Sequence, residues 1–142
     1  MSGAFVQATA VSIDGRAVLL LGPPGCGKSD LALRLIARGA ALVADDAVMV
    51  RLVDYRLVAE ATGIGVPHLH VAGIGVVDVA LVGPTPVALA VTLDPALVLR
   101  DRSTALGMFG PIDGLHVPQI ALAAFEASAP DKLLLALERW GH

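Results

Sequence analysis

The chain has 142 residues, which is long enough for one domain with a substantial core, so we expect a single domain over residues 1–142. Hydrophobic residues make up 56% of the chain and the mean hydropathy is +0.75, but Pro, Gly or charged residues interrupt every apolar run before about 18 residues, which argues against a membrane span. The net charge of −3, without a basic cluster, argues against nucleic-acid binding.

The start of the chain and its cysteine content indicate a compartment. Residues 1–5 contain no basic segment of the kind that opens a secretory signal, and a single cysteine, Cys26, excludes an intramolecular disulfide. We therefore expect a cytoplasmic protein. The excess of apolar residues in so short a chain also predicts buried subunit interfaces in a homo-oligomer, with a densely packed monomer as the alternative.

The N-terminal part predicts a β-hairpin followed by a helix. Residues 5–13 have the composition of a strand, Asp14-Gly15-Arg16 forms a turn, and residues 17–21 form a second, apolar strand. A helix is expected over residues 28–38, because apolar side chains recur there at four-residue spacing and a glycine follows. A glycine-rich segment joins the second strand to this helix.

This segment matches the phosphate-binding pattern GxxxxGK[ST] in the strand-to-helix context that the pattern requires. Its glycines let consecutive backbone N–H groups face a β-phosphate, Lys28 can reach the β- and γ-oxygens, and the Ser29 hydroxyl can bind Mg²⁺. We predict a nucleotide-binding loop formed by Gly22, Pro23, Pro24, Gly25, Cys26, Gly27, Lys28 and Ser29. The alternative is a glycine-rich turn with an incidental lysine. Cys26 is interpreted as a small spacer in preference to a redox switch.

The rest of the chain alternates short apolar runs with turn residues, which predicts further strands. They cover residues 41–44, 48–53, 56–59, 81–82 and 87–93, with a turn at Asp54-Tyr55 and a partly looped segment over residues 61–79. A second helix is predicted over residues 130–140, where one face carries Leu133, Leu134, Leu137 and Trp140. Several strands with one early helix predict an α/β fold with a mixed β-sheet.

Two adjacent aspartates, Asp45 and Asp46, follow the strand predicted over residues 41–44, and Asp46 stands 17 residues after Ser29 (46 − 29). A nucleotide site needs one carboxylate near Mg²⁺, and a kinase needs another that accepts the hydroxyl proton of the acceptor. We expect this strand to lie beside the strand that precedes the loop. Because neighbouring strand residues face opposite sides, the two aspartates could divide these tasks. The alternative is a polar strand end or a helix cap.

Three segments carry a family resemblance, namely GPPGCGKSDLALRLIARGAALVADDAVMV, GIGVVDV (residues 73–79) and FEASAPDK (residues 125–132). Together they resemble the catalytic domain of bacterial HPr kinase/phosphorylase in its short form, without an N-terminal domain. The resemblance implies a P-loop-containing mixed β-sheet of the phosphoenolpyruvate carboxykinase-like type and a hexameric assembly. It also implies ATP- and Mg²⁺-dependent phosphorylation of a serine on HPr, a phosphocarrier of the phosphotransferase system, or on an HPr-like protein. Lys28 would then bind phosphate, Ser29 would bind Mg²⁺, and Asp46, with Asp45 beside it, would accept the proton.

Three positions depart from the family pattern. Gln7 stands where the family has a catalytic histidine, and His70-Val71-Ala72-Gly73 stands where it has Glu-x-Arg-Gly. Gln cannot titrate and Ala cannot neutralise phosphate charge, so the nucleotide platform is retained while groups that assist transfer are missing. His70 is a candidate metal ligand that would suit Mn²⁺ better than Mg²⁺, and a loop histidine without a metal is the alternative. A metal pair of His68 and His70 lacks a third ligand.

Two functions follow from these features. The first is an ATP-dependent serine kinase, with or without the reverse phosphorylase activity, in which Arg100 or Arg102 supplies the arginine that the family uses after the signature. The alternative for these two arginines is that both are solvated loop charges. The second is a nucleotide-binding pseudokinase that acts through assembly or partner contact. A small-metabolite kinase is disfavoured, because 142 residues leave little chain for a separate acceptor lid.

Overall fold

A computed structural model of the chain describes residues 3–62, 68–71, 73–79, 81–94 and 106–142. Within these residues the helices are α1 (Lys28–Ile36) and α2 (Ala129–Trp140). The strands are β1 (Ala4–Val6), β2 (Ala8–Ile13), β3 (Arg16–Leu21), β4 (Ala41–Ala44), β5 (Val48–Val53), β6 (Arg56–Ala61), β7 (His68–Val71), β8 (Gly75–Asp78), β9 (Thr85–Leu93), β10 (Gly107–Ile112) and β11 (Leu115–Leu122). The described part of the chain is therefore mixed α/β, as predicted.

One large sheet organises the molecule. Its strands follow the order β1-β5-β6-β9-β3-β2-β4, and β11 adds to β9 with β10 beyond it. β3 and β11 run parallel to β9, whereas the hairpins β2–β3, β5–β6 and β10–β11 are antiparallel. The separate pair β7–β8 is a small antiparallel hairpin. Parallel and antiparallel pairing thus occur in the same sheet, which confirms the predicted mixed sheet.

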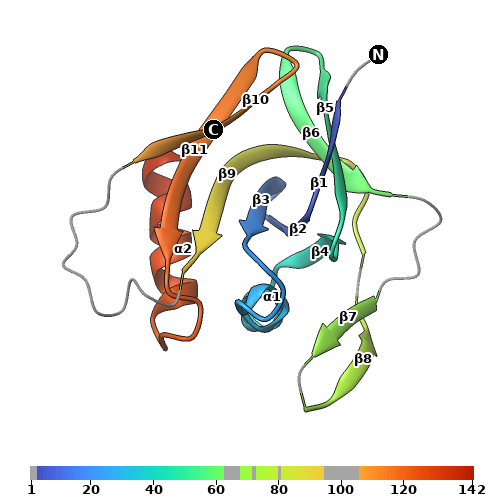
Figure 1. Cartoon of the computed structure of the whole chain (residues 1–142), viewed down its shortest axis with the longest axis vertical. Helices are drawn as coiled ribbons and strands as arrows, with labels where there is room; N and C mark the ends of the chain where they lie inside the picture. Colours follow the sequence, from blue (N-terminus) through green and yellow to red (C-terminus); the bar gives the residue numbers. More distant parts are fainter. Residues whose placement is uncertain (1–2, 63–67, 72, 80, 95–105) are drawn as a thin grey trace.

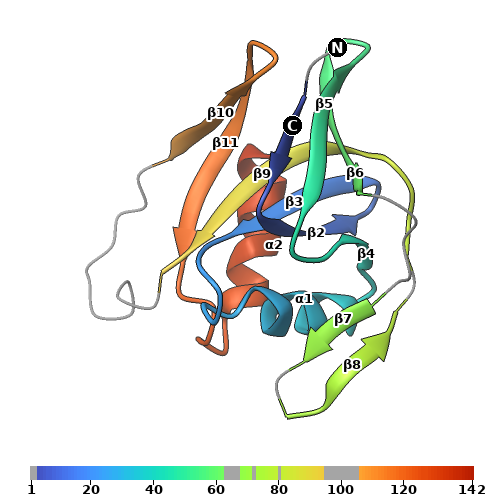
Figure 2. The ribbon, with the colours of Figure 1, turned by 45° about the vertical axis from the view of Figure 1, so that its right-hand side comes forward.

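The sheet is strongly curved. Figures 1 and 2 show β9 bending along its length, with the hairpins β5–β6 and β10–β11 rising on either side of it. β9 pairs with β6 only near its start, at Thr85 and Pro86, and with β3 and β11 further along. The bend therefore lets one long strand belong to both parts of the sheet.

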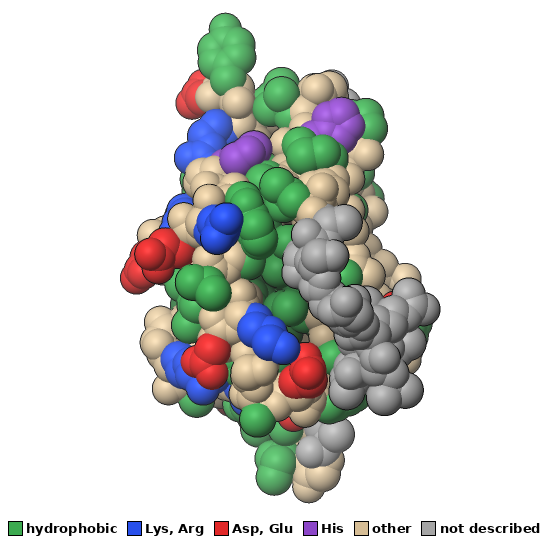
Figure 3. All heavy atoms as spheres, turned by 90° about the vertical axis from the view of Figure 1, so that its left-hand side faces the viewer, with side chains coloured by type: hydrophobic (Ala, Val, Ile, Leu, Met, Phe, Trp, Pro, Cys, Tyr) green, Lys and Arg blue, Asp and Glu red, His purple; other side chains and the backbone are tan. Residues whose placement is uncertain are grey.

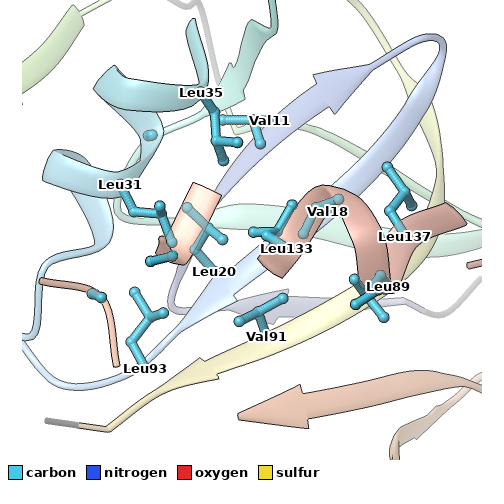
Figure 4. Packing of buried hydrophobic residues seen from close by; sticks show 14 of the residues in the cluster. Val11, Val18, Leu20, Leu31, Leu35, Leu89, Val91, Leu93, Leu133 and Leu137 are labelled. Carbon is cyan, nitrogen blue, oxygen red and sulfur yellow. The ribbon is translucent and has the colours of Figure 1, made fainter. Parts of the chain in front are cut away.

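The core has two layers, one on each face of the central strands. On the first face, α1 and α2 pack on β2, β3 and β9; Figure 4 shows this cluster, which includes Val11, Val18, Leu20, Leu31, Leu35, Leu89, Val91, Leu93, Leu133 and Leu137. On the second face, side chains of the rising hairpins, including Val50, Leu57 and Val117, pack on the opposite side chains of the same strands, including Ala10, Leu19 and Ala90. Side chains that alternate along β2, β3 and β9 supply both layers. Neither described helix combines the length and hydrophobicity that a membrane crossing needs.

Several sequence predictions are confirmed with small shifts. The turns at Asp14-Gly15 and Asp54-Tyr55 close hairpins, and all four residues have positive φ, from 49° at Asp54 to 79° at Gly15, as two-residue hairpin turns of this kind require. The helix predicted to residue 38 ends at Ile36. The predicted strand at residues 81–82 is reduced to an isolated bridge between Leu81 and Leu42.

Two expectations about strands are wrong. The single strand predicted over residues 5–13 is broken at Gln7, because β1 pairs with β5 while β2 turns away to pair with β3 and β4. β4, the strand that Asp45 and Asp46 follow, lies beside β2 and not beside β3. The two-residue turn between β2 and β3 favours local pairing, so β2 takes the position next to the loop strand.

Candidate functional site

The carboxyl ends of four strands lie at one edge of the sheet. β3 and β11 each pair with β9 in parallel. β2 is antiparallel to both β3 and β4, so β4 runs in the same direction as β3. Their carboxyl ends therefore share an edge, which is where α/β sheets bind ligands. The glycine-rich loop follows β3, the two aspartates follow β4, and the turn that contains Phe125 follows β11. Although β4 does not lie beside β3 as predicted, Asp45 and Asp46 are still close to the glycine-rich loop.

The loop of residues 22–29 has the backbone of a phosphate cradle. Gly25 and Gly27 have φ values of 83° and 102°, which favour glycine, and Gly27 precedes the first turn of α1 without a side-chain cap. The free N–H groups of that turn are the natural partners of an anion. Cys26 is buried, and a Cβ built on Gly22 would stand 2.5 Å from its Sγ, so the thiol fills the space that Gly22 leaves. This packing favours the spacer interpretation of Cys26.

Lys28 is held inside the loop. Its side chain is buried, and the Nζ ammonium donates to the backbone oxygens of Gly22, at 2.6 Å, and Pro23, at 3.2 Å. The first residues of the loop thus fix the charge in the middle of the cradle. Charge-assisted bonds of this kind are stronger than neutral ones and keep the ammonium oriented inside the loop.

Asp45 is tied to its surroundings. One carboxylate oxygen, Oδ1, accepts from Thr9 Oγ1 at 2.7 Å and from Ser29 Oγ at 3.3 Å, while Oδ2 accepts from the His70 backbone N–H at 3.4 Å. Thr9 is fully buried in β2, the strand beside β4. Asp45 therefore links the sheet, the start of α1 and the β7–β8 hairpin, and its carboxylate stands next to the Ser29 hydroxyl as a metal-directed group would.

Asp46 differs from its neighbour. It is exposed, has a φ of 68°, and makes no hydrogen bond or ion pair with another described residue. It lines two adjoining cavities, one of about 320 Å³ on the side of the phosphate loop and one of about 190 Å³ beneath β7. The smaller cavity is also lined by Asp45, Thr62 and His68. A free carboxylate at the boundary between two cavities can receive a proton from a group that enters the smaller one.

The two histidines of β7 have different neighbours. His70 is exposed and lines both cavities together with Asp46, whereas His68 Nε2 stands 3.2 Å from Asp78 Oδ1 on β8. Among the described residues, no group of three or more His, Cys, Asp or Glu side chains could hold a metal ion. His70 is thus within the site, and the two histidines do not form a metal centre with a third such ligand there.

Of the remaining predicted positions, the structure describes Gln7. Gln7 is exposed and directly precedes Ala8, whose partner across the sheet is Leu21, the last residue before the loop. It therefore stands at the correct edge but lines neither cavity. Ala72, Arg100 and Arg102 lie outside the described residues.

Sequence reasoning missed three residues that build the site. Thr9 bonds to Asp45, Arg34 reaches from α1 to the backbone after β11, and Phe125 lines the larger cavity beside Gly27 and Lys28. A hydroxyl side chain in a mainly apolar strand was the one signal for Thr9. Arg34 and Phe125 lie in segments that carry the family resemblance, but no local pattern showed their contacts, because Arg34 bonds to Ala124 and Glu126, 90 and 92 residues away in sequence.

Comparisons with known proteins agree with this geometry. The family model of the HPr Serine kinase C-terminal domain matches residues 2–101. The HPr kinase/phosphorylase of Caldicellulosiruptor bescii is 49% identical over 72 residues, which are 50% of this chain and 23% of the relative. That of Caldanaerobacter subterraneus subsp. tengcongensis is 38% identical over 98 residues, 68% of this chain and 32% of the relative.

A solved structure supports the fold independently. The Hpr(Ser) kinase/phosphatase from Coxiella burnetii superposes with a TM-score of 0.80 at 26% identity, over 96% of this chain and 88% of that one. The predicted fold class is thereby confirmed. The curated relatives are much longer, since the matched part spans only a quarter to a third of their length. The chain belongs to the HPr Serine kinase C-terminal domain family.

Proposed function

We propose that the chain is an ATP-dependent kinase that phosphorylates a serine of HPr or of an HPr-like phosphocarrier, and that it can run the reverse phosphorolysis. The observation that carries the proposal is the meeting of the phosphate loop, the Ser29–Asp45 pair and the free Asp46 at one sheet edge. The acceptor is taken from the relatives, which bear the name HPr kinase/phosphorylase. We infer a cytoplasmic location from the use of ATP.

The residues present fit a Mg²⁺–nucleotide. Mg²⁺ prefers oxygen ligands and is commonly bound by one or two carboxylates together with substrate phosphates. Ser29 Oγ and the Asp45 carboxylate, 3.3 Å apart, would hold it, and Lys28 with the N–H groups of the loop would hold the phosphates. When bound, the metal neutralises charge on the phosphate oxygens during transfer. His70 lines the same cavity and would offer Mn²⁺ a nitrogen ligand.

The chain itself supplies the proton acceptor. Asp46 faces the smaller cavity, whose volume of about 190 Å³ suits one side chain rather than a large substrate. A serine hydroxyl entering from that side would lose its proton to the Asp46 carboxylate while its oxygen bonds to the γ-phosphorus; the bond from that phosphorus to the β,γ-bridging oxygen would break, and ADP would leave. Asp45 is a poorer base for this step, because Thr9 and Ser29 already donate to it.

A catalytically weakened pseudokinase is the second candidate, and the identities of Gln7, His70 and Ala72 favour it. They lack the catalytic histidine, the Glu carboxylate and the Arg charge of the family pattern, and a missing group of this kind typically costs on the order of 100-fold in rate. In that case the nucleotide would control assembly or partner contact.

We also propose that the chain forms a homo-oligomer, a hexamer by analogy with the family resemblance. Large hydrophobic side chains are exposed at several places, among them Met108, Leu106 and Leu135 at 57%, 46% and 66%. Hydrophobic side chains lie between charged ones on the side of the molecule shown in Figure 3. Subunit contacts would cover such surface.

Phosphate transfer decides between the two functions. Radiolabelled ATP, Mg²⁺ and an HPr-type acceptor from the same cell would be incubated with the wild type and with a variant carrying Gln7→His, His70→Glu and Ala72→Arg. A kinase labels the acceptor in both cases, and the restored variant does so at least tenfold faster. Nucleotide binding without labelling by the wild type, together with labelling by the restored variant, would favour the pseudokinase.

A further inference from the structure

An exposed aromatic ring stands at the mouth of the phosphate cavity. Phe125 is 62% exposed, yet it lines the larger cavity together with Pro24, Gly25, Gly27 and Lys28. Figures 1 and 2 both place the turn after β11 next to the loop between β3 and α1. Water-exposed phenylalanine at a polar, phosphate-binding cavity is unusual, because such rings gain from being covered. A ligand in the cavity would cover it.

The ring is held against the loop. A Cβ built on Gly27 would stand 3.1 Å from Phe125 Cζ, 3.3 Å from Cε1 and 2.8 Å from the Cβ of Ala124. The absence of a side chain at Gly27 is thus what allows the turn after β11 to pack directly on the phosphate loop. The ring therefore has a fixed place relative to the amides that would hold the phosphates.

Arg34 of α1 fixes the backbone on both sides of this ring. Its guanidinium donates to the carbonyl oxygens of Ala124 and Glu126, the latter at 3.1 Å, and pairs with Asp30 at 2.8 Å. Lys132 Nζ stands 3.1 Å from Glu126 Oε1 and ties the same turn to α2. The turn is therefore braced by both helices, so the ring needs little ordering when a ligand arrives.

The chemistry of the ring indicates which part of a ligand it receives. The loop amides and Lys28 take anionic oxygens, whereas Phe125 offers a flat apolar face without a hydrogen-bonding group. A nucleotide carries its apolar π-surface at the base, at the opposite end from the terminal phosphates. Base–aromatic stacking is sequence-tolerant, because every base has a π-face. A purine of either kind would therefore be accepted.

We propose that Phe125 is the platform on which the nucleobase stacks and that Arg34 is the residue that positions it. The inference rests on the proposed nucleotide binding and adds the recognition of the nucleoside to it. It predicts that the nucleoside part of the ligand contributes to affinity through Phe125, while the diphosphate part binds independently of that ring.

Calorimetric titration with two probes, ADP and inorganic pyrophosphate, both with Mg²⁺, tests the proposal. Phe125→Ala should weaken ADP binding about tenfold or more, the range for losing one base–aromatic stack, and leave pyrophosphate within twofold. Phe125→Trp should bind ADP about as tightly as the wild type. In each variant the affinity for GDP should change in the same direction as the affinity for ADP. Phe5→Ala is the matched control, because Phe5 is a comparably exposed phenylalanine, at 72%, but lies on β1 and lines neither cavity.

The positioning role of Arg34 has its own readout. Arg34→Met keeps the aliphatic stem and removes the bonds to the turn, so it should also weaken ADP selectively. Adding Arg34→Met to Phe125→Ala should then lower ADP affinity little further, because both act through one contact. Full additivity would overturn the role of Arg34.

The remaining outcomes separate this inference from the proposed function. If the wild type binds both probes and Phe125→Ala leaves both unchanged, the stacking proposal is overturned while nucleotide binding stands. An equal loss of ADP and pyrophosphate would mean that Phe125 only supports the loop, which also overturns it. If Phe125→Ala dissociates an oligomer and ADP binding is unchanged, the ring covers a subunit contact instead. Failure of the wild type to bind either probe would remove both proposals.

Discussion

Removal of the Asp45 side chain should destabilise the fold, because the half-buried Asp45 carboxylate accepts the hydrogen bond of a fully buried hydroxyl. Asp45→Ala leaves the hydroxyl of Thr9, which is fully buried, without its 2.7 Å acceptor. An unsatisfied buried donor costs about 1–3 kcal/mol. The weaker contacts from Ser29 and the His70 backbone, at 3.3 and 3.4 Å, are lost as well. For a domain of this size about 4 °C of Tm corresponds to each kcal/mol, so Tm should fall by roughly 4–12 °C.

A second substitution isolates the cause. Thr9→Val removes the hydroxyl at nearly constant shape, so the double variant Thr9→Val, Asp45→Ala has no unsatisfied donor and should be more stable than Asp45→Ala alone. Urea denaturation followed through Trp140, the single tryptophan of the chain, measures all three variants. The reasoning is refuted if Asp45→Ala changes the free energy of unfolding by less than about 0.5 kcal/mol, the usual range for surface positions, or if the two substitutions simply add.

Other predictions concern the neighbouring residues. Asp46→Asn should keep nucleotide binding, since Asp46 has no partner among the described residues. It should abolish acceptor labelling, because an amide cannot take the proton. A larger loss of turnover in Asp45→Asn would reverse the two roles. Gly27→Ala should lower the free energy of unfolding by about 1–3 kcal/mol, because φ is 102° and the new Cβ would meet Ala124 at 2.8 Å; unchanged urea midpoints would contradict this. If His70 contacts the metal, nucleotide should bind more tightly with Mn²⁺ than with Mg²⁺ in the wild type, and His70→Glu should reverse that order. The same metal preference in the wild type and in His70→Glu would exclude His70 as a ligand.

Local patterns made the backbone of the glycine-rich loop and the hairpin turns predictable. The phosphate-binding pattern occupies the consecutive residues 22–29, and the turns at Asp14-Gly15 and Asp54-Tyr55 depend on residues that tolerate positive φ. Asp45 and Asp46 were found because two carboxylates followed a strand, although the strand was placed beside the wrong neighbour. The aspartates reach the loop in either arrangement, since β3 and β4 point the same way.

Long-range pairing was not predictable from such patterns. The break at Gln7 arises because β1 joins β5, which lies more than 40 residues further along the chain. β10 and β11 were missed, since Gly107, Gly110 and Pro111 make the first of them look like a loop. The Thr9–Asp45 hydrogen bond and the contact of Arg34 with the turn after β11 form only in the assembled sheet and helices. The spacing of apolar residues along the sequence therefore could not predict them.

The division of labour between the aspartates also became clear only in three dimensions. Sequence alone offered two equivalent carboxylates, whereas the structure ties Asp45 to Thr9 and Ser29 and leaves Asp46 exposed between two cavities. The structure therefore gives a physical reason for the role proposed for each of them.

Binding of Mg²⁺–ADP at the phosphate loop, measured by calorimetric titration, tests the central claim most directly. The account predicts one nucleotide per chain for the wild type and a loss of about 1–3 kcal/mol in binding free energy, roughly 5- to 150-fold in affinity, for Lys28→Ala. Lys28→Ala must remain folded in the same buffer, because its Nζ also bonds the Gly22 and Pro23 carbonyls. A wild type that binds no nucleotide, or a folded Lys28→Ala that binds as tightly as the wild type, would contradict it.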